Sequence, residues 1–312
     1  MKLGIIFPGQ GSQVVGMGLG VVAAFPVAAE IFARASDVLG YDLVALVRDG
    51  TEEQLRETRF SQPAIYVTNY ALAAASESLD VCIVSAGHSF GEYCSLTIAE
   101  SLQFEDALRL VNERALAMQQ AAEETPGSMA AILGLDVAAV RAAAEAARHE
   151  GRVQLANFNA PGQIVVSGDA AAVQRAGDLA MEAGAKRVVP LNVSGAWHSV
   201  LMESARVRFA PFVESATIRP PVFSVISNVD ARRYESVAAV RHNLIASLTT
   251  EVLWHETAER LIQEGPELVV EFGASPVLAP LFRRMPGAPK VFHAGDAASL
   301  TKLRTIIEEQ AA

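Results

Sequence analysis

Cysteine, aromatic residues and long apolar runs are all scarce in this sequence. The 312 residues include two cysteines, Cys82 and Cys94, and aromatic residues make up 6%. Two cysteines are too few for a disulfide framework, so we expect reduced, mostly buried thiols. No apolar run reaches the roughly 20 residues that cross a bilayer, and the run from Met1 to Phe7 meets Pro8 too early for a signal peptide. We therefore expect a soluble, cytoplasmic protein.

Basic residues are outnumbered as well. The 25 lysines and arginines face 35 aspartates and glutamates, which gives a formal net charge of −10. This balance argues against general affinity for nucleic acid or anionic membranes. Hydrophobic residues make up 51% and charged residues 19%, so the chain can bury the core of one large or two modest domains.

The most informative stretch is an apolar run, from Val81 to Ala86, that leads into Gly-His-Ser-Phe-Gly at residues 87–91. A strand, a sharp turn and a helix-forming segment follow one another here. Such an elbow strains the backbone of Ser89, and Gly87 and Gly91 let the turn close without side-chain collisions. An incidental serine in a glycine-rich turn is the alternative. Because the strand and the helix are both present, we predict a nucleophile.

Strand-like and helix-like segments alternate along most of the chain. Apolar runs such as Leu3 to Phe7 and Leu268 to Phe272 are separated by segments of helical periodicity, which predicts a mainly parallel sheet flanked by helices. Residues 127–195 instead follow β-α-β-β-α-β order, the ferredoxin-like arrangement. We therefore predict a large α/β domain of residues 1–126 and 196–312, with residues 127–195 inserted as a small ferredoxin-like subdomain.

An arginine interrupts the apolar stripe of the helix predicted from Phe104 to Glu124. Arg114 lies between Val111 and Met118 on this inward face. A guanidinium that points inward needs an anion, and its position alone fits a structural salt bridge as well as a ligand carboxylate. The helix follows the elbow directly, so its inner face can reach Ser89, which favours a ligand.

A serine hydroxyl needs a base, and the chain has six histidines. His198 follows small residues where a loop enters a predicted helix, the kind of place where active groups of open α/β sheets gather. This position gives it only a modest lead over a structural histidine. His255 begins H-E-x-x-E rather than the zinc-binding H-E-x-x-H, so we predict no metal site.

The first predicted strand leads into Gly9-Gln10-Gly11, which could begin a dinucleotide-binding fingerprint. The third glycine of that fingerprint would fall at Val14, where the side chain would hinder helix packing and phosphate approach. We rank a nucleotide-binding or non-catalytic module below the alternative, a loop whose backbone amides line a site beside the elbow.

Taken together, these motifs resemble the malonyl-CoA:acyl carrier protein transacylase family, which includes the acyltransferase domains of polyketide and fatty acid synthases. The matching segments follow the family's order over nearly the whole chain: residues 7–13 (FPGQGSQ), residues 87–93 (GHSFGEY), Arg114 with Met118-Gln119, residues 157–163 (NFNAPGQ) leading to Ser167-Gly168, and His198-Ser199 with Leu201-Met202. The resemblance implies a hydrolase-like large domain, an inserted ferredoxin-like subdomain and a cleft between them.

The resemblance also implies roles for five residues. Ser89 would be the nucleophile and His198 its base, the amides of Gln10 and Phe90 would form the oxyanion hole, and Arg114 would bind the free carboxylate of a malonyl group. The implied activity is ping-pong transfer of malonyl from malonyl-CoA through a serine ester to the phosphopantetheine thiol of an acyl carrier protein in fatty acid biosynthesis, with no cofactor. A trans-acting polyketide acyltransferase and a serine esterase or thioesterase remain alternatives.

One position departs from the family. Ser247 occurs where the family usually has a glutamine that is associated with orienting the histidine, and Trp254 follows. A backbone carbonyl at this position would leave the base unaffected, whereas a required side-chain amide would leave it weaker. We also expect a monomer whose acidic carrier protein would need a local basic rim. The candidates for this rim are Lys186, Arg187, Arg232, Arg233, Arg283 and Arg284.

Overall fold

A parallel sheet forms the centre of the larger part of the molecule. The computed structural model describes residues 1–283, 285 and 287–311. Within them the sheet order is β7-β2-β1-β8-β9, and every neighbouring pair is parallel. The strands are β1 (Leu3–Phe7), β2 (Cys82–Gly87), β7 (Ser224–Ile226), β8 (Leu268–Phe272) and β9 (Val291–Ala294). β1 and β8 are buried along their whole length, as expected for strands covered on both faces.

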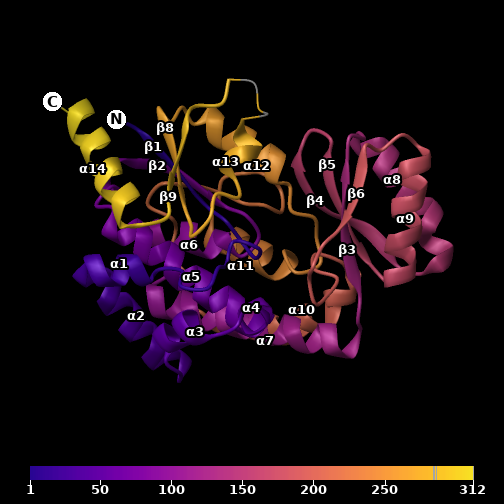
Figure 1. Ribbon diagram of the computed structural model, residues 1–312, viewed down its shortest axis with the longest axis horizontal. Coiled ribbons are helices and arrows are strands. Elements are labelled where there is room, and N and C mark those ends of the chain that lie inside the picture. Colours follow the sequence, from indigo (N-terminus) through magenta and orange to yellow (C-terminus); the bar gives the residue numbers. More distant parts are fainter. Residues whose placement is uncertain (284, 286, 312) are drawn as a thin grey trace.

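Helices surround this sheet (Figure 1). They are α1 (Leu19–Ala24), α2 (Pro26–Leu39), α3 (Leu43–Asp49), α4 (Glu52–Arg56), α5 (Thr58–Ala75), α6 (Gly91–Ile98), α7 (Phe104–Glu124), α10 (Glu203–Ser215), α11 (Val237–Ala246), α12 (Trp254–Gln263), α13 (Ala279–Phe282) and α14 (Ala297–Ala311). α7 has the bounds predicted from the sequence. No helix in the described ranges is both long and apolar enough to cross a membrane.

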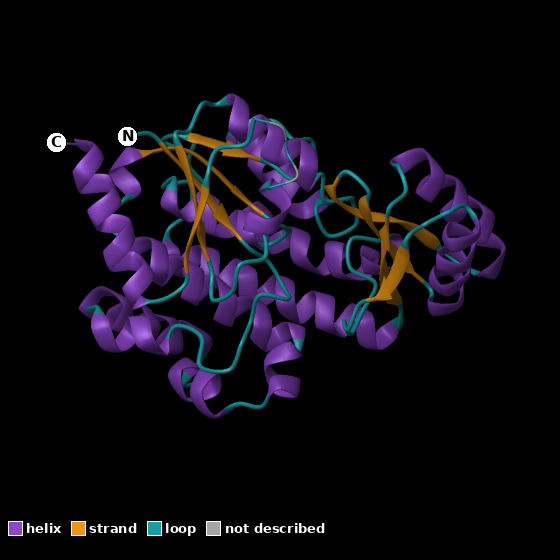
Figure 2. Cartoon of the chain, turned by 45° about the horizontal axis from the view of Figure 1, so that its top comes forward, coloured by secondary structure: helices purple, strands orange, loops and turns teal. Residues whose placement is uncertain are grey.

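The smaller part is an antiparallel sheet covered by two helices. Its order is β4-β5-β3-β6. Its elements are β3 (Ser128–Leu133), α8 (Val137–Ala146), β4 (Val153–Ala160), β5 (Gln163–Gly168), α9 (Ala170–Glu182) and β6 (Arg187–Pro190). Figures 1 and 2 show α8 and α9 on the side of this sheet away from the large domain. The predicted α/β fold with a ferredoxin-like unit is thus confirmed, while the boundaries at residues 127 and 195 stay a prediction.

The small sheet is joined to the large domain through β4. The amide of Phe158 donates to the carbonyl of Val252 at 2.9 Å, and the amide of Val252 donates to the carbonyl of Ala156 at 2.8 Å. Next to this junction, Asn159 Oδ1 lies 2.9 Å from His88 Nε2. The asparagine-containing end of β4 therefore lies against the predicted elbow.

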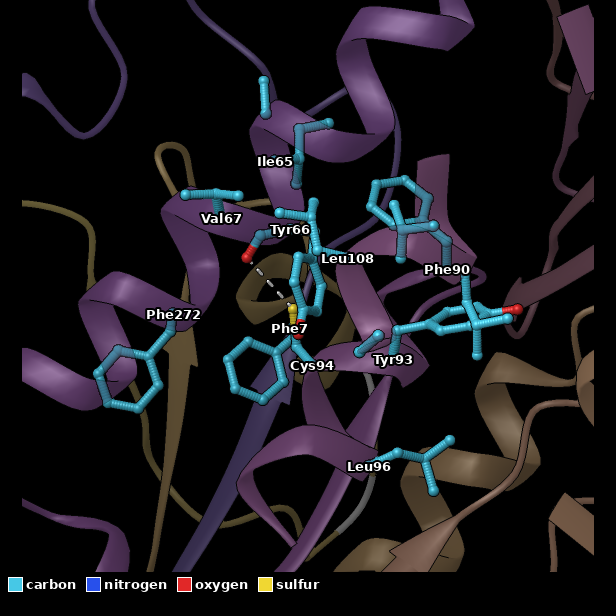
Figure 3. Packing of buried hydrophobic residues seen from close by; sticks show 14 of the residues in the cluster. Phe7, Ile65, Tyr66, Val67, Phe90, Tyr93, Cys94, Leu96, Leu108 and Phe272 are labelled. Atoms are coloured by element: carbon cyan, nitrogen blue, oxygen red, sulfur yellow. Dashed lines mark hydrogen bonds between the residues drawn. The ribbon is translucent and has the colours of Figure 1, made fainter. Parts of the chain in front are cut away.

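Several aromatic residues pack around the strand and helix that flank the elbow. Figure 3 shows Phe7, Tyr66 and Tyr93 within one cluster that also holds Cys94. The Cys94 thiol lies 3.7 Å from the carbonyl oxygen of Tyr66, and both cysteines are buried and free, as predicted. Burial of a large apolar side chain stabilises a fold by about 1.5–3 kcal/mol, so this cluster gives the elbow a rigid base.

Candidate active site

Ser89 occupies a tight turn between β2 and α6. Its φ angle is 53°, a left-handed conformation that is uncommon outside glycine. A Cβ added to Gly87 would lie 1.9 Å from the carbonyl carbon of Gly91, and one added to Gly91 would lie 2.4 Å from the carbonyl oxygen of Phe7. Both positions therefore require glycine, and the strand, turn and helix have the arrangement that the sequence predicts.

His198 links the elbow to the segment after α11. Its Nε2 lies 2.8 Å from Ser89 Oγ, and its Nδ1 lies 2.8 Å from the carbonyl oxygen of Ser247. Because a carbonyl only accepts, Nδ1 carries the proton and Nε2 is free to accept one from the serine hydroxyl. The Ser247 hydroxyl donates instead to the carbonyl of Leu244 at 2.8 Å. Position 247 thus contacts the histidine through its backbone.

The imidazole of His198 is held in its neutral form. Burial, reinforced by the positive charge of Arg114, lowers the pKa of His198 to about 3. At neutral pH the ring is therefore unprotonated, which is the form that can take a proton from a hydroxyl group.

Arg114 is fully buried beside the serine. Its side chain donates to Gln62 Oε1 at 2.8 Å through Nη1 and to Ser89 Oγ at 3.4 Å through Nη2, while Nε has no partner. Among the described residues Arg114 forms no ion pair; the nearby acid, Glu92, instead accepts hydrogen bonds from Asn228 and Tyr234. Burial lowers the pKa of Arg114. The structural salt bridge that the sequence allowed for Arg114 is therefore not found among the described residues.

Two backbone amides beside Ser89 are free to bind a ligand. The loop after β1 lies against the elbow so closely that a Cβ on Gly9 would be 2.6 Å from the carbonyl oxygen of His88. Within the described residues, neither Gln10 nor Phe90 donates its backbone amide to another residue. The amide of Ser89, by contrast, is used: it donates to Asn228 Oδ1 at 2.8 Å.

A pocket of about 320 Å³ lies over this arrangement. The predicted residues Ser89, His198, Gln10 and Arg114 line it from the large domain, together with side chains such as Asn157 of the small sheet. Phe90 is buried below it with 1% of its surface exposed. Ser247 does not line it and reaches the site through the carbonyl contact to His198.

Several polar residues at the site were missed from the sequence. Gln62 binds Arg114, Gln154 donates to the carbonyl of His198 at 3.2 Å, and Asn228 binds the elbow. Gln62 follows the helical pattern of a buried face and could have been found in that way; the other two lack a local signal. In the described ranges no group of three metal-ligating side chains occurs.

The chain matches the acyl transferase domain family over residues 5–288. It is 40% identical to the malonyl CoA-acyl carrier protein transacylase of Haemophilus influenzae over 309 residues, which cover 98% of this chain and 99% of that protein.

Solved structures agree with this match. An acyl carrier protein S-malonyltransferase from Vibrio cholerae superposes with a TM-score of 0.92 at 39% identity, over 97% of this chain and 100% of that one. A complex of a type II polyketide synthase acyl carrier protein with its malonyl-transacylase contains a chain that gives a TM-score of 0.94 at 39% identity, over 98% of this chain and 100% of that one. The chain therefore belongs to the malonyl-CoA:acyl carrier protein transacylase family.

Proposed function

We propose that this protein transfers malonyl groups from malonyl-CoA to an acyl carrier protein through an ester on Ser89. The observation that carries the proposal is the buried guanidinium of Arg114, 3.4 Å from the Ser89 hydroxyl and without an ion pair among the described residues. The relatives' printed names describe the same reaction. Burying a cation without a counter-ion is costly, so the site is built for a ligand that carries a carboxylate.

The first half-reaction forms the ester. His198 Nε2 takes the proton of Ser89 as the serine oxygen attacks the thioester carbonyl of malonyl-CoA. The amides of Gln10 and Phe90 are the donors for the negative charge that develops on the carbonyl oxygen. When the carbon–sulfur bond breaks, His198 returns its proton to the sulfur of CoA. The malonyl group then stays on Ser89.

The second half-reaction runs the same steps with another thiol. The phosphopantetheine thiol of the carrier protein gives its proton to His198 and attacks the ester carbonyl. The same two amides hold the oxyanion, and the carbon–oxygen bond to Ser89 breaks as His198 returns the proton to the serine oxygen. Water competes with the thiol during the covalent stage, so the enclosure of the pocket by both domains favours transfer over hydrolysis.

Arg114 separates this proposal from the esterase alternative. Its planar fork can hold the malonyl carboxylate through two charge-assisted hydrogen bonds. A site built for such bonds rejects acyl groups that lack the partner, because the cation is then left buried and unpaired. An esterase for neutral esters would gain nothing from a buried cation facing its nucleophile.

The choice of carrier protein and several properties of the protein itself stay predictions. Of the six basic residues considered for the carrier rim, Arg284 lies outside the described residues and Arg233 is paired with Glu264. The other four, Lys186, Arg187, Arg232 and Arg283, are exposed. The relatives' names include malonyl CoA-acyl carrier protein transacylases and a polyketide biosynthesis protein, so carrier proteins of fatty acid synthesis and of polyketide synthesis are both candidates. The monomeric state, the cytoplasmic location and the lack of a cofactor are likewise expectations.

Intact-protein mass spectrometry after brief mixing with malonyl-CoA tests the proposal. We expect a mass increase of one malonyl group on the wild type and none on Ser89→Ala. Adding phosphopantetheinylated carrier protein should remove the adduct and increase the mass of the carrier by the same amount. An unmodified wild type in the presence of intact malonyl-CoA would contradict the proposal, and tight binding of NAD would favour the nucleotide-binding alternative.

A further inference from the structure

The side chain of Asn228 forms hydrogen bonds to two backbone groups of the elbow, one at Ser89 and one at Gly87. Asn228 lies just after β7, in the loop that continues alongside the end of β2. Its Oδ1 accepts from the amide of Ser89 at 2.8 Å, and its Nδ2 donates to the carbonyl of Gly87 at 2.6 Å. One side-chain amide thus satisfies two backbone groups of the same turn.

These two backbone groups would otherwise be left without partners. Ser89 lies between the end of β2 at Gly87 and the start of α6 at Gly91, so neither the parallel ladder nor the helix supplies an acceptor for its amide. Leaving a buried backbone group unpaired costs about 1–3 kcal/mol, and the left-handed conformation of a non-glycine residue costs a further ~1–3 kcal/mol. The bonds from Asn228 favour the one backbone conformation in which both groups are satisfied.

Asn228 is itself held in place. It is 2% exposed, its own amide donates to Glu92 Oε2 at 2.9 Å, and its carbonyl accepts from the amide of Leu253 at 2.9 Å. The other oxygen of Glu92 accepts from the hydroxyl of Tyr234. Glu92 lies on the first turn of α6, so the helix that starts at the elbow also fixes the residue that braces it.

We propose that Asn228 is a positioning residue for Ser89, and that Glu92 positions Asn228. Asn228 touches neither CoA nor the acyl group in this proposal; it acts by holding the serine oxygen 2.8 Å from His198 and by leaving the amide of Phe90 free for the oxyanion. The inference rests on the proposed function, because it takes Ser89 as the reacting group.

The test compares Asn228→Ala with Asn243→Ala. Asn243 is a matched control, since it is also a buried asparagine and its Nδ2 donates to the neighbouring Ser227 hydroxyl at 3.0 Å without touching the elbow. A misplacement of about 1 Å can cost on the order of 100-fold in rate. We therefore expect single-turnover acylation of Asn228→Ala by saturating malonyl-CoA to slow by roughly 100-fold. The half-saturating concentration should change by less than about threefold, because substrate binding is left intact.

Thermal unfolding distinguishes positioning from a loss of stability. The inference predicts that both variants stay folded at the assay temperature, with the larger loss of stability in Asn228→Ala because it leaves two backbone groups unpaired, and that only Asn228→Ala loses acylation rate. Equal acylation rates for the two variants would overturn the inference. So would a change in the half-saturating concentration of malonyl-CoA without a change in the acylation rate. A wild type that forms no malonyl adduct would instead contradict the proposed function, so the two failures are distinguishable.

A second pair of variants covers the case in which Asn228→Ala does not fold. Glu92→Gln keeps an oxygen for the amide of Asn228 and can donate to Tyr234, whereas Glu92→Ala removes both contacts. We expect the acylation rate of Glu92→Gln to exceed that of Glu92→Ala by roughly tenfold, since only Glu92→Gln keeps the contact that orients Asn228. Indistinguishable rates for these two variants would also overturn the inference.

Discussion

Arg114 Nη2 lies 3.4 Å from the Ser89 hydroxyl, and the other terminal nitrogen, Nη1, donates a hydrogen bond of 2.8 Å to Gln62 Oε1. The cation is thus held beside the predicted nucleophile by a neutral amide. A neutral partner orients the guanidinium without supplying a counter-charge, so a carboxylate on the substrate can form the ion pair that Arg114 lacks among the described residues.

Arg114→Ala should separate malonyl from acetyl transfer. Two charge-assisted hydrogen bonds are worth about 3–5 kcal/mol together, so acylation by malonyl-CoA should fall by at least about 100-fold while acylation by acetyl-CoA survives. Steady-state kinetics with both substrates measures this. Arg109→Ala is the control, because Arg109 lies on the same helix but is exposed and paired with Asp106 at 2.9 Å. Equal loss with both substrates would contradict a carboxylate clamp.

The pH dependence of acylation should reveal a histidine that stays neutral in acid. Burial beside Arg114 lowers the pKa of His198 to about 3, and the base form is present above that value. The single-turnover rate of the wild type should therefore change by less than about threefold between roughly pH 5 and pH 7.5. Rapid-quench measurements at constant ionic strength test this, and a midpoint near 6.5 would show that the ring is not desolvated.

The side chain at position 247 should matter little. His198 Nδ1 bonds to the backbone carbonyl of Ser247 at 2.8 Å, while the hydroxyl turns back to Leu244. Ser247→Ala and Ser247→Gln should therefore both keep the acylation rate within about threefold of wild type, since a side chain that makes no catalytic contact contributes little to the barrier. A tenfold gain in Ser247→Gln would mean that a side-chain amide does assist the histidine.

Gly87→Ala should prevent the elbow from closing. The added methyl group would lie 1.9 Å from the backbone of Gly91, and relieving such a clash requires moving the chain, at a cost above about 3 kcal/mol. Chemical denaturation measures the loss. Gly20→Ala provides the comparison: Gly20 lies in α1 with nothing within 4 Å of an added Cβ, so this variant should gain about 0.5–1 kcal/mol.

Glu92 should make stability fall as the pH rises. Burial raises the pKa of Glu92 from 4.5 to about 7, so between these values the folded protein keeps a proton that the unfolded chain has lost. The resulting stabilisation is present below pH 4.5 and is lost as the pH passes 7, by about 3 kcal/mol in total.

The difference in unfolding free energy between wild type and Glu92→Gln isolates this contribution, because the other titrating groups are common to both proteins. Relative to Glu92→Gln, the wild type should become less stable as the pH rises from about 5 to about 8. A difference that is independent of pH would show that Glu92 titrates at its ordinary pKa when folded.

Local patterns in the sequence identify the parts of the site that depend on local structure. The elbow needs glycine on both sides of Ser89, and the inward position of Arg114 follows from the spacing of its helix. The pairing of Ser89 with His198 spans 109 positions, and no periodicity encodes such a distance. The choice of His198 among the histidines therefore depended mainly on the family resemblance.

The elements and contacts that were missed share a weak local signal. β9 has four residues, and only Ala294 is fully buried, so it lacks both the length and the alternation of a recognisable strand. α13 is a helix of four residues. Asn228 lies in a polar loop where asparagine is common, and its role comes from the partners that the fold brings to it.

The order of the strands in the central sheet has a consequence for synthesis on the ribosome. β1 pairs with β2 on one side and with β8, Leu268–Phe272, on the other, whereas the small sheet is complete by Pro190. Units with contiguous sequence can fold as they emerge, while pairings of high sequence separation must wait. We therefore expect the small sheet to be complete while β1 still has one unpaired edge, and this edge can pair with other chains until β8 has been synthesised.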